Sequence, residues 1–374
     1  MKNERFTLNL VSIYIIKNVL LNFSTINIFH RYSQINQVVT ITILVLLLFN
    51  IVLFSCFRLK ELLIIIFAGL ITAVSSWKSG DLSFFVYFIC IVALKNIEFD
   101  TILVRIIAIQ FISILLILIL FKMNIIPERV SERLGIIRHS FGFNHPGHLP
   151  TFCLFIFMGA TYLIKDRFKL YMFIPMITIM IVLNKLTDGR TSFFCFIIFC
   201  TLYVFNRYFD LSKIINFLNV FLPSFFVLLS VYITRFMTRN KIYYELDLLL
   251  SGRFSFMNYF YNNYGISILG QKLNIFTTYE SELNVGVTTQ VLDNLYLGLL
   301  IKYGLLFCVI FLLFLFFLER CLYSKKEYTL MIILLVVLVY SLISNIAPLV
   351  ELNFIFIVGV ALFKNNNSFK ERHN

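Results

Sequence analysis

Residues 38–57 read VVTITILVLLLFNIVLFSCF, twenty consecutive residues without a charged side chain. A helix of about 20 apolar residues is long enough to cross the hydrocarbon core of a bilayer. Lipid offers no partners for exposed backbone groups, so a segment that crosses it is helical unless it belongs to a closed barrel. This stretch therefore predicts a transmembrane helix.

The composition of the whole chain agrees with that interpretation. Of the 374 residues, 60% are hydrophobic and 14% are charged, and the mean hydropathy is +0.90. A soluble fold of this length could not bury so much apolar surface, and intrinsic disorder requires low hydrophobicity. The sequence predicts an all-α polytopic membrane protein in which residues 1–374 form a single integral membrane domain.

Apolar runs of similar length, bounded by charged residues, recur along the chain. They predict about twelve transmembrane helices. The predicted spans are Phe6–Ile28, Val38–Phe57, Leu62–Trp77, Leu82–Ile97, Ile102–Phe121, His148–Ile164, Leu170–Asn184, Ser192–Phe205, Ile214–Arg235, Asn294–Leu318, Tyr328–Ser344 and Pro348–Phe363.

Basic residues cluster in alternate short connections, and with twelve spans all of these clusters fall on one side. Because short cytoplasmic loops carry an excess of Lys and Arg, that side is predicted to be cytoplasmic, with both termini on it. We therefore expect a multi-pass membrane protein with this orientation. The clusters are Lys2 and Arg5, Arg58 and Lys60, Lys95, Lys165 with Arg167 and Lys169, Arg207 and Lys213, Arg320 with Lys325 and Lys326, and Lys364 with Lys370 and Arg372.

Two long connections, residues 122–147 and 236–293, then become the first and the large extracytoplasmic loop. Long translocated segments are largely exempt from the charge rule, so their basic residues do not contradict this orientation. Functional residues are often carried on such loops above a rigid scaffold. The sequence predicts that the protein acts on the outer face of the membrane.

The net charge of +13 comes from 32 Lys and Arg against 19 Asp and Glu, a balance that in a soluble protein would suggest nucleic acid. Here the larger share of the basic residues lies on the predicted cytoplasmic rim and sets orientation. A second group, with Arg138, Arg190 and Arg253 at its centre, lies outside. We therefore expect no nucleic-acid partner.

The first outer loop includes residues 127–148, PERVSERLGIIRHSFGFNHPGH, with three arginines and three of the chain's five histidines. Arginine presents a planar fork that fits phosphate oxygens, and histidine can move a proton near neutral pH. A solvated basic loop near lipid headgroups is the alternative. A zinc site from His139, His145 and His148 is disfavoured because no cysteine or HxxxH spacing accompanies them, so no metal is expected.

Two further outer segments carry similar residues. Residues 185–192, KLTDGRTS, place Arg190 in a short outer connection, where the charge rule disfavours it; snorkelling to anionic headgroups is the alternative to a functional role. The large loop contains SGRF at residues 251–254, Glu280, and LDNLY at residues 292–296. Its many aromatic residues could either stack on sugar rings or form an interfacial belt.

The order of these segments resembles the Wzy-type family of bacterial O-antigen and capsular polysaccharide polymerases, which is related to the O-antigen ligases. The resemblance covers roughly residues 120–310. It rests on RHSFGFNHP at 138–146, GRTS at 189–192, SGR at 251–253 and LDN at 292–294.

The resemblance implies a multi-pass glycosyltransferase of the bacterial cytoplasmic membrane. It would join undecaprenyl-diphosphate-linked oligosaccharide repeat units into polymer, without a metal, a nucleotide sugar or another cofactor. The implied partners are that lipid-linked substrate, membrane lipid, a flippase and a chain-length regulator.

On this hypothesis an acceptor hydroxyl attacks the anomeric carbon and undecaprenyl diphosphate leaves. His145 is the first choice for the general base, followed by Asp293 and Glu280, and Asn144 is expected to orient the sugar. The residues expected to bind the diphosphate are Arg133, Arg138, Arg190 and Arg253.

Two alternatives remain open at this point. A ligase that moves finished glycan to another acceptor would carry the same groups. A lipid-linked oligosaccharide flippase or transporter would place charges along a central cavity, whereas the predicted spans hold few charges, chiefly Lys17 and Lys302.

Overall fold

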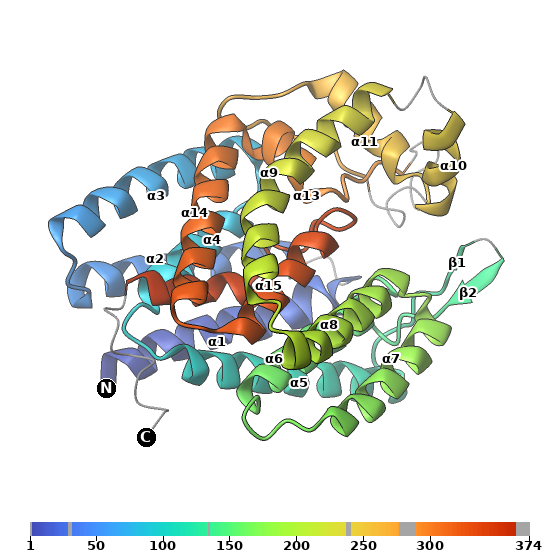
Figure 1. The fold of residues 1–374 in the computed structure, drawn as a ribbon, viewed down its shortest axis with the longest axis horizontal. Helices are drawn as coiled ribbons and strands as arrows, with labels where there is room; N and C mark the ends of the chain where they lie inside the picture. The colour runs from blue at the N-terminus through green and yellow to red at the C-terminus, as the bar shows by residue number, and fades with distance from the viewer. Residues whose placement is uncertain (1, 29–31, 134, 237–240, 277–288, 364–374) are drawn as a thin grey trace.

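A computed structural model describes residues 2–28, 32–133, 135–236, 241–276 and 289–363 (Figure 1). The described chain is helical apart from one short hairpin and its connections, which agrees with the expected all-α class. The elements are α1 (Lys2–Asn22), η1 (Thr25–Ile28), α2 (Tyr32–Phe54), α3 (Leu59–Ser79), α4 (Ser83–Ala93), α5 (Phe99–Lys122), β1 (Ser131–Arg133), β2 (Ile136–Arg138), α6 (His148–Leu163), η2 (Leu170–Met172), α7 (Phe173–Thr187), α8 (Arg190–Phe209), α9 (Ser212–Phe236), α10 (Lys241–Leu249), α11 (Arg253–Tyr264), α13 (Leu295–Gly298), the π-helical turn η4 (Leu299–Tyr303), α14 (Leu305–Ser324), α15 (Tyr328–Tyr340) and η5 (Ile355–Leu362).

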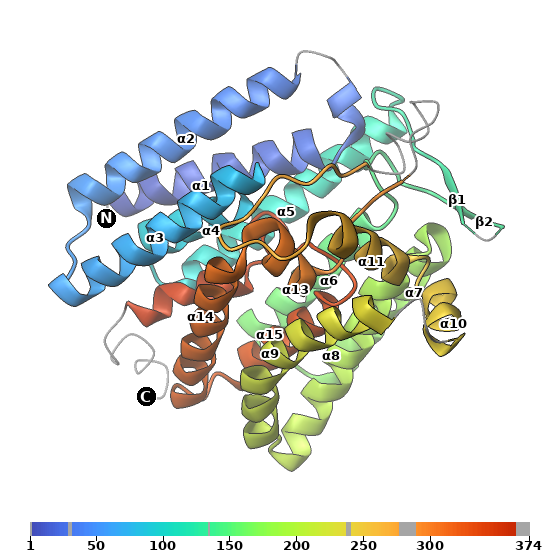
Figure 2. The ribbon, with the colours of Figure 1, turned by 90° about the horizontal axis from the view of Figure 1, so that it is seen from above.

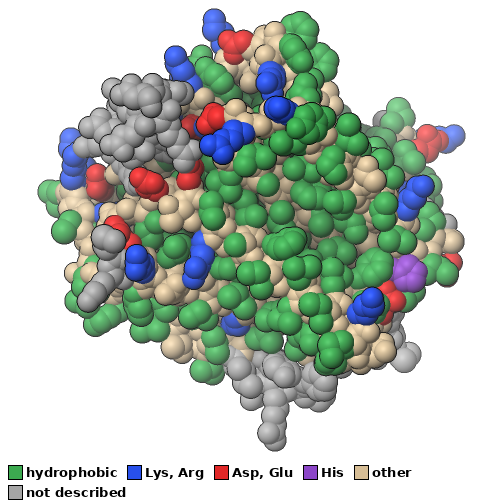
Figure 3. All heavy atoms as spheres, turned by 90° about the horizontal axis from the view of Figure 1, so that it is seen from below, with side chains coloured by type: hydrophobic (Ala, Val, Ile, Leu, Met, Phe, Trp, Pro, Cys, Tyr) green, Lys and Arg blue, Asp and Glu red, His purple; other side chains and the backbone are tan. Residues whose placement is uncertain are grey.

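Within the described residues, seven helices are long and apolar enough to cross a membrane. Three shorter apolar helices, α4, α6 and α15, accompany them. Figure 3 shows a face on which hydrophobic side chains cover a broad central area while charged side chains lie mostly toward the margins. The seven long segments are Asn36–Phe54, Leu59–Ser79, Phe99–Lys122, Leu170–Thr187, Arg190–Phe209, Ser212–Phe236 and Leu305–Ser324.

The core of the molecule is formed by segments that are apolar on every side. Residues 330–338 of α15 are all buried, as are residues 355–361 of η5. A helix that is hydrophobic all round has no face to turn to water, so it belongs in a protein core or in lipid. Here α15 packs between α8 and α9, while α2 and α3 keep large apolar side chains exposed at the periphery.

The predicted span Asn294–Leu318 is not one continuous helix. It begins as α13, widens into η4, breaks at Gly304 and resumes as α14. The break occurs where a strip of the large loop meets the helix: the Leu305 amide donates to the Ser267 carbonyl at 2.8 Å, and the Gln271 amide donates to the Lys302 carbonyl at 3.0 Å. The last predicted span, Pro348–Phe363, begins without regular helix and becomes the 3₁₀ helix η5.

The two predicted loops also contain regular structure. The first holds the antiparallel hairpin β1–β2, which no pattern in the sequence predicted, and the large loop holds α10 and α11. In both ribbon views the hairpin and α10 lie at one end of the molecule, while the start of α1 and the end of η5 lie toward the other (Figures 1 and 2). Parts of both segments predicted to face outward therefore lie at the same end of the molecule.

The break at Gly304 generates a prediction about stability. Gly304 has a φ of +95°, and a Cβ there would lie 2.4 Å from the Gly270 backbone nitrogen. Gly304→Ala should therefore lower the free energy of unfolding by roughly 3 kcal/mol or more, the sum of left-handed strain and a backbone clash. Thermal unfolding in detergent measures this.

Gly135→Ala is the matched control. Gly135 also has a positive φ, +76°, but no described atom lies within 4 Å of the position that a Cβ would take there. Gly135→Ala should lower the free energy of unfolding only by the left-handed strain, about 1–2 kcal/mol. Equal losses in the two variants would show that the close approach of the loop to Gly304 is not a structural constraint.

Candidate functional site

The β1–β2 hairpin brings two of the predicted arginines onto one face. Ser131 pairs with Arg138 across the strands, and Arg133 lies two residues beyond Ser131. Directly opposed residues share a face, and so do residues two apart on a strand. Arg133 and Arg138 therefore both point toward the α7–α8 turn, where Arg138 Nε donates to the Thr187 carbonyl at 3.1 Å.

The α7–α8 turn places a carboxylate between arginines. Asp188 ends α7 in the left-handed conformation, with a φ of 50°, and Arg190 is the first residue of α8. Arg190 Nε donates to Asp188 Oδ1 at 2.7 Å, and the Arg133 guanidinium bonds Asp188 Oδ2. In the sequence Asp188 is only one residue of the KLTDGRTS segment. In the structure it bonds Arg133 and Arg190, two of the arginines predicted to bind the diphosphate.

The large loop supplies the fourth arginine. Arg253 begins α11, and its Nε lies 3.6 Å from Asp293 Oδ2. The start of α11 is fixed by Asp247, whose carboxylate accepts from the Phe254 amide at 2.7 Å. Asn294, directly after Asp293, caps α13 by accepting from the Leu297 amide at 2.7 Å. Both members of the Arg253–Asp293 pair thus lie at a helix start.

The four arginines are close enough for their charges to interact. Burial, followed by the charges of Arg133, Arg190 and Arg253, lowers the pKa of Arg138 to about 10, against the opposing effect of Asp188. Arg138 is 9% exposed and remains charged at neutral pH. Arg133 and Arg190 pair with Asp188, Arg253 pairs with Asp293, and Arg138 bonds a backbone carbonyl instead. Four guanidinium groups against two carboxylates leave two positive charges unbalanced within this group. We call the four arginines with Asp188 and Asp293 the arginine site.

His145 lies beside the arginine site as a neutral imidazole. Burial lowers its pKa to about 4, and the charges of Arg138, Arg253 and Arg133 act in the same direction. Its Nδ1 accepts from the Gly147 amide at 3.0 Å, so the proton of the neutral ring lies on Nε2. This tautomer presents an N–H donor, which suits contact with an oxyanion. The prediction that His145 is the general base stays a prediction.

Asp293 is half-buried, and its surroundings favour the protonated form more than water does. Loss of solvent raises the pKa of the carboxyl, and the neighbouring Arg253 guanidinium offsets this only in part. A raised pKa makes the carboxylate a stronger base. The third predicted base, Glu280, lies outside the described residues.

Asn144 connects the site to the end of α1. Its Nδ2 donates to the Asn22 carbonyl at 2.8 Å, and its backbone amide donates to the Phe23 carbonyl at 2.8 Å. Its Oδ1 has no hydrogen-bond partner within the described part of the chain. The side chain thus anchors the loop with its amide nitrogen, while its oxygen is a buried acceptor without a partner in that part of the chain.

A cluster of hydroxyl groups, which the sequence did not predict, joins three helices at the starts of α6 and α8. Thr151 Oγ1 lies 3.0 Å from Ser192 Oγ and 2.9 Å from the Tyr340 hydroxyl, and the last two lie 3.1 Å apart. Ser192 stands in the GRTS motif, but Thr151 and Tyr340 have no distinctive sequence signal. The cluster ties the first turns of α6 and α8 to the central helix α15.

The three histidines of the first loop separate into different environments. His139 Nδ1 lies 3.2 Å from Glu128, while the rings of His145 and His148 lie 5.5 Å apart. In the ranges that the structure describes, no group of three His, Cys, Asp or Glu residues is arranged to hold a metal ion.

Comparison with known proteins found no relative of this chain. The chain matches no family model, no curated protein and no solved structure.

The shared carboxylate makes a prediction about stability. Asp188→Asn removes the charge between Arg133 and Arg190 and should lower the free energy of unfolding by roughly 1–3 kcal/mol, because the arginines then repel without compensation. Thermal unfolding in detergent should show a smaller loss at high salt than at low salt, since salt screens that repulsion.

Asp166→Asn is the control, because Asp166 is an exposed carboxylate in the connection after α6. It should leave the unfolding temperature unchanged at either salt concentration. An Asp188→Asn variant as stable as Asp166→Asn would refute the role assigned to the shared carboxylate.

Proposed function

We propose that this chain is a membrane glycosyltransferase that polymerises undecaprenyl-diphosphate-linked oligosaccharide repeat units on the outer face of the bacterial cytoplasmic membrane. The observation that carries the proposal is the convergence of four arginines from three separate segments around two carboxylates. Arg133 and Arg138 come from the hairpin, Arg190 from the start of α8 and Arg253 from the start of α11.

The charge of the arginine site fits a diphosphate diester. Such a group carries one negative charge on each phosphate, and the arginine site has two unbalanced positive charges. Guanidinium groups bind phosphate oxygens through paired N–H donors. The α8 N-terminus, which has no side-chain cap and begins with Arg190, adds backbone donors and a favourable dipole.

The proposed reaction is a nucleophilic substitution at the anomeric carbon of the lipid-linked donor. The acceptor hydroxyl forms the new C–O bond while the bond from that carbon to the diphosphate oxygen breaks, and the diphosphate leaves with the electron pair. In this proposal Asp293 takes the hydroxyl proton in place of His145, because the pKa of Asp293 is raised and it lies beside Arg253, whereas His145 Nδ1 already accepts from the Gly147 amide. The arginines and His145 Nε2–H stabilise the charge that develops on the leaving group.

The proposed topology has twelve spans, both termini in the cytoplasm, and the loops 122–147 and 236–293 outside. The common location of the hairpin and α10 at one end of the molecule supports it (Figure 2). A polyprenyl tail would then remain in the bilayer while its diphosphate reaches the arginine site at the membrane surface.

Replacing single arginines by lysine tests the diphosphate contacts. Arg190→Lys and Arg253→Lys keep the charge but lose the fork, so polymer synthesis should fall roughly 10- to 100-fold, less than the 10²–10³-fold that follows complete loss of a transition-state donor. Electrophoresis of the lipid-linked glycan made by membranes carrying each variant measures the polymer and its length.

Arg167→Lys is the control, because Arg167 is exposed and lies in the connection after α6. Normal polymer from both Arg190→Lys and Arg253→Lys would refute the proposed diphosphate site. The same gels separate polymerase from ligase: loss of a polymerase leaves single lipid-linked repeats, whereas loss of a ligase leaves long lipid-linked polymer.

The pH dependence of synthesis tests Asp293. A general base acts in its deprotonated form, so the rate should fall as the pH drops through the raised pKa of Asp293, above the usual Asp value of about 3.9. Asp293→Glu keeps a carboxyl and therefore an acid limb. Asp293→Asn should lose that limb together with roughly 10²–10⁴-fold of the rate. An unchanged acid limb in Asp293→Asn would assign the base to another residue.

A further inference from the structure

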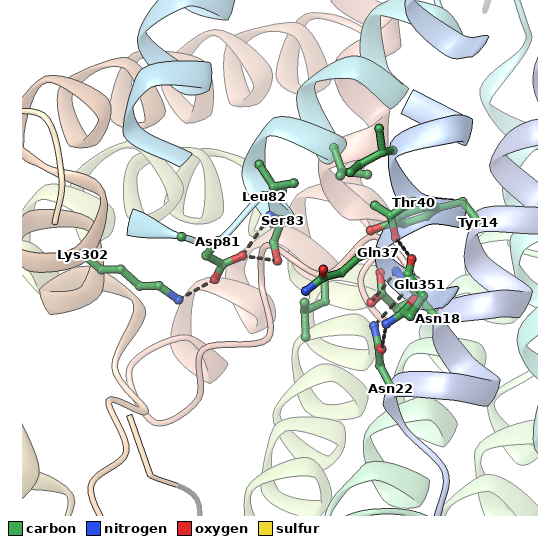
Figure 4. Close-up of a pocket in the computed structure, with 15 residues that line it drawn as sticks. Tyr14, Asn18, Asn22, Gln37, Thr40, Asp81, Leu82, Ser83, Lys302 and Glu351 are labelled. Atoms are coloured by element: carbon green, nitrogen blue, oxygen red, sulfur yellow. Dashed lines mark hydrogen bonds and ion pairs between the residues drawn. The ribbon is translucent and has the colours of Figure 1, made fainter. Parts of the chain in front are cut away.

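A polar cavity of about 570 Å³ lies between α1, α2 and the α3–α4 turn (Figure 4). This volume falls within the usual range of small-molecule sites, about 300–1,000 Å³. One side carries Asp81 and Ser83, with Lys302 beside them, and the other carries Asn18, Asn22 and Glu351. Gln37 projects from α2 between the two groups.

An ordered chain of amide groups forms one side of the cavity. Asn36 Nδ2 donates to Asn22 Oδ1 at 2.7 Å, Asn22 Nδ2 donates to Asn18 Oδ1 at 3.2 Å, and Asn18 Nδ2 donates to Glu351 Oε1 at 3.2 Å. Asn18 and Glu351 are both 3% exposed. Buried polar groups are expensive in a membrane protein and usually mark a functional site. Asn36 Oδ1 has no partner within the described residues, so the chain of amides ends on a buried acceptor that is not satisfied there.

The opposite side is fixed by an ion pair. Lys302 Nζ bonds Asp81 Oδ2, the Tyr303 hydroxyl donates to the same oxygen at 2.7 Å, and the Ser83 hydroxyl donates to Asp81 Oδ1 at 2.6 Å. Burial raises the pKa of Asp81, but the charge and hydrogen bond of Lys302 and the bonds from Ser83 outweigh it, and the pKa falls to about 2. The carboxylate is therefore ionised and held in one orientation.

Each basic side chain at the cavity has an acidic neighbour. Lys302 pairs with Asp81, and Lys17, which bonds Thr40 in the wall, is close enough to Glu351 for their charges to interact. With Asp81 neutralised by Lys302, a site lined by amides, hydroxyls and carboxylates favours a neutral ligand rich in hydroxyl groups over an ion. Planar amides and carboxylates can each bond two neighbouring hydroxyls of a sugar ring, and Tyr14 adds an aromatic ring.

The cavity is linked through Asn22 and Asn144 to the first outer loop, which carries His145 beside the arginine site. Asn22 lines the cavity with its side chain, and its carbonyl accepts from Asn144, next to His145. We propose that this cavity binds sugar residues of the acceptor oligosaccharide, while the arginine site binds the diphosphate of the donor. The inference rests on the proposed function for the role of the sugar, but binding of a glycan to the cavity can be measured without any reaction.

Two probes separate the two sites in the full-length protein in detergent. The first is the free oligosaccharide repeat unit, released by mild acid from the lipid-linked form that the source cells make. Because it lacks the diphosphate, it should bind the cavity and not the arginine site. Saturation-transfer NMR measures that binding. The second is inorganic pyrophosphate, which should raise the unfolding temperature by binding the arginine site.

Gln37→Trp fills the cavity from an exposed position on α2, so it should fold normally. We expect at least a tenfold loss of oligosaccharide affinity and an unchanged pyrophosphate effect. Val38→Trp is the matched control, since Val38 is the next residue, is 64% exposed and does not line the cavity. It should keep both responses. Arg190→Lys should weaken the pyrophosphate effect and keep oligosaccharide binding.

The outcomes distinguish failure of this inference from failure of the proposed function. The inference is overturned if Gln37→Trp and Val38→Trp bind the oligosaccharide equally well, or if the unaltered protein does not bind it while pyrophosphate still stabilises. If pyrophosphate has no effect and membranes make no polymer, yet the oligosaccharide binds in a Gln37-dependent way, the cavity is a glycan site and the proposed polymerase activity is wrong.

Discussion

The Asp188 carboxylate makes the arginine site possible, because without it the guanidinium groups around it would repel one another. It bonds Arg133 from the hairpin and Arg190 from α8, and the α7–α8 turn in which it lies also accepts a bond from Arg138. One carboxylate therefore fixes the hairpin to the bundle. Because the α7–α8 turn holds the three arginines of the hairpin and of α8 without neutralising all of them, it leaves the positive charge that an anionic ligand requires.

Away from the arginine site, the same rule explains how polar side chains are placed in an apolar protein. Asn219 Nδ2 donates to the fully buried Glu319 at 2.8 Å and to the Met331 carbonyl at 2.9 Å, which joins α9, α14 and α15. A polar group removed from water needs a partner, so each one specifies a neighbour. Apolar packing alone is less selective, and these bonds help to select one arrangement of otherwise similar helices.

Hydropathy identified the helical class but could not separate helices that face lipid from helices that face protein. α15 and α2 are both strongly apolar, yet α15 lies in the core and α2 keeps exposed apolar side chains. The break in the helix at Gly304 could not be predicted from hydropathy either, because it arises from the close approach of Gly270, which lies far away in the sequence. The hydropathy of a segment reports how favourably it leaves water, and lipid and a protein interior are alike in that respect.

For the arginine site, the sequence was informative where a residue departed from a rule. Arg190 and Arg253 lie on the predicted outer side, where the orientation of the chain does not require them, and the structure brings them together with Arg133 and Arg138. The partners that hold them could not be predicted in the same way. No sequence pattern marks Asp188, Thr151 or Tyr340, because their contacts form only when folding brings separate segments together.

The end of α1 has a special position, because Asn22 lines the cavity and also bonds the first outer loop beside the arginine site. Asn22 and Phe23 accept bonds from Asn144, and the Thr25 amide donates to the Gly142 carbonyl at 3.0 Å, so the first outer loop is tied to this strip of chain. A transfer between two glycans requires both to be held at a fixed separation, since misplacement of reacting groups by about 1 Å can cost two orders of magnitude in rate. On the proposed function, the bonds that hold the first outer loop to residues 22–25 help to fix that separation, whereas two independently mobile loops would not.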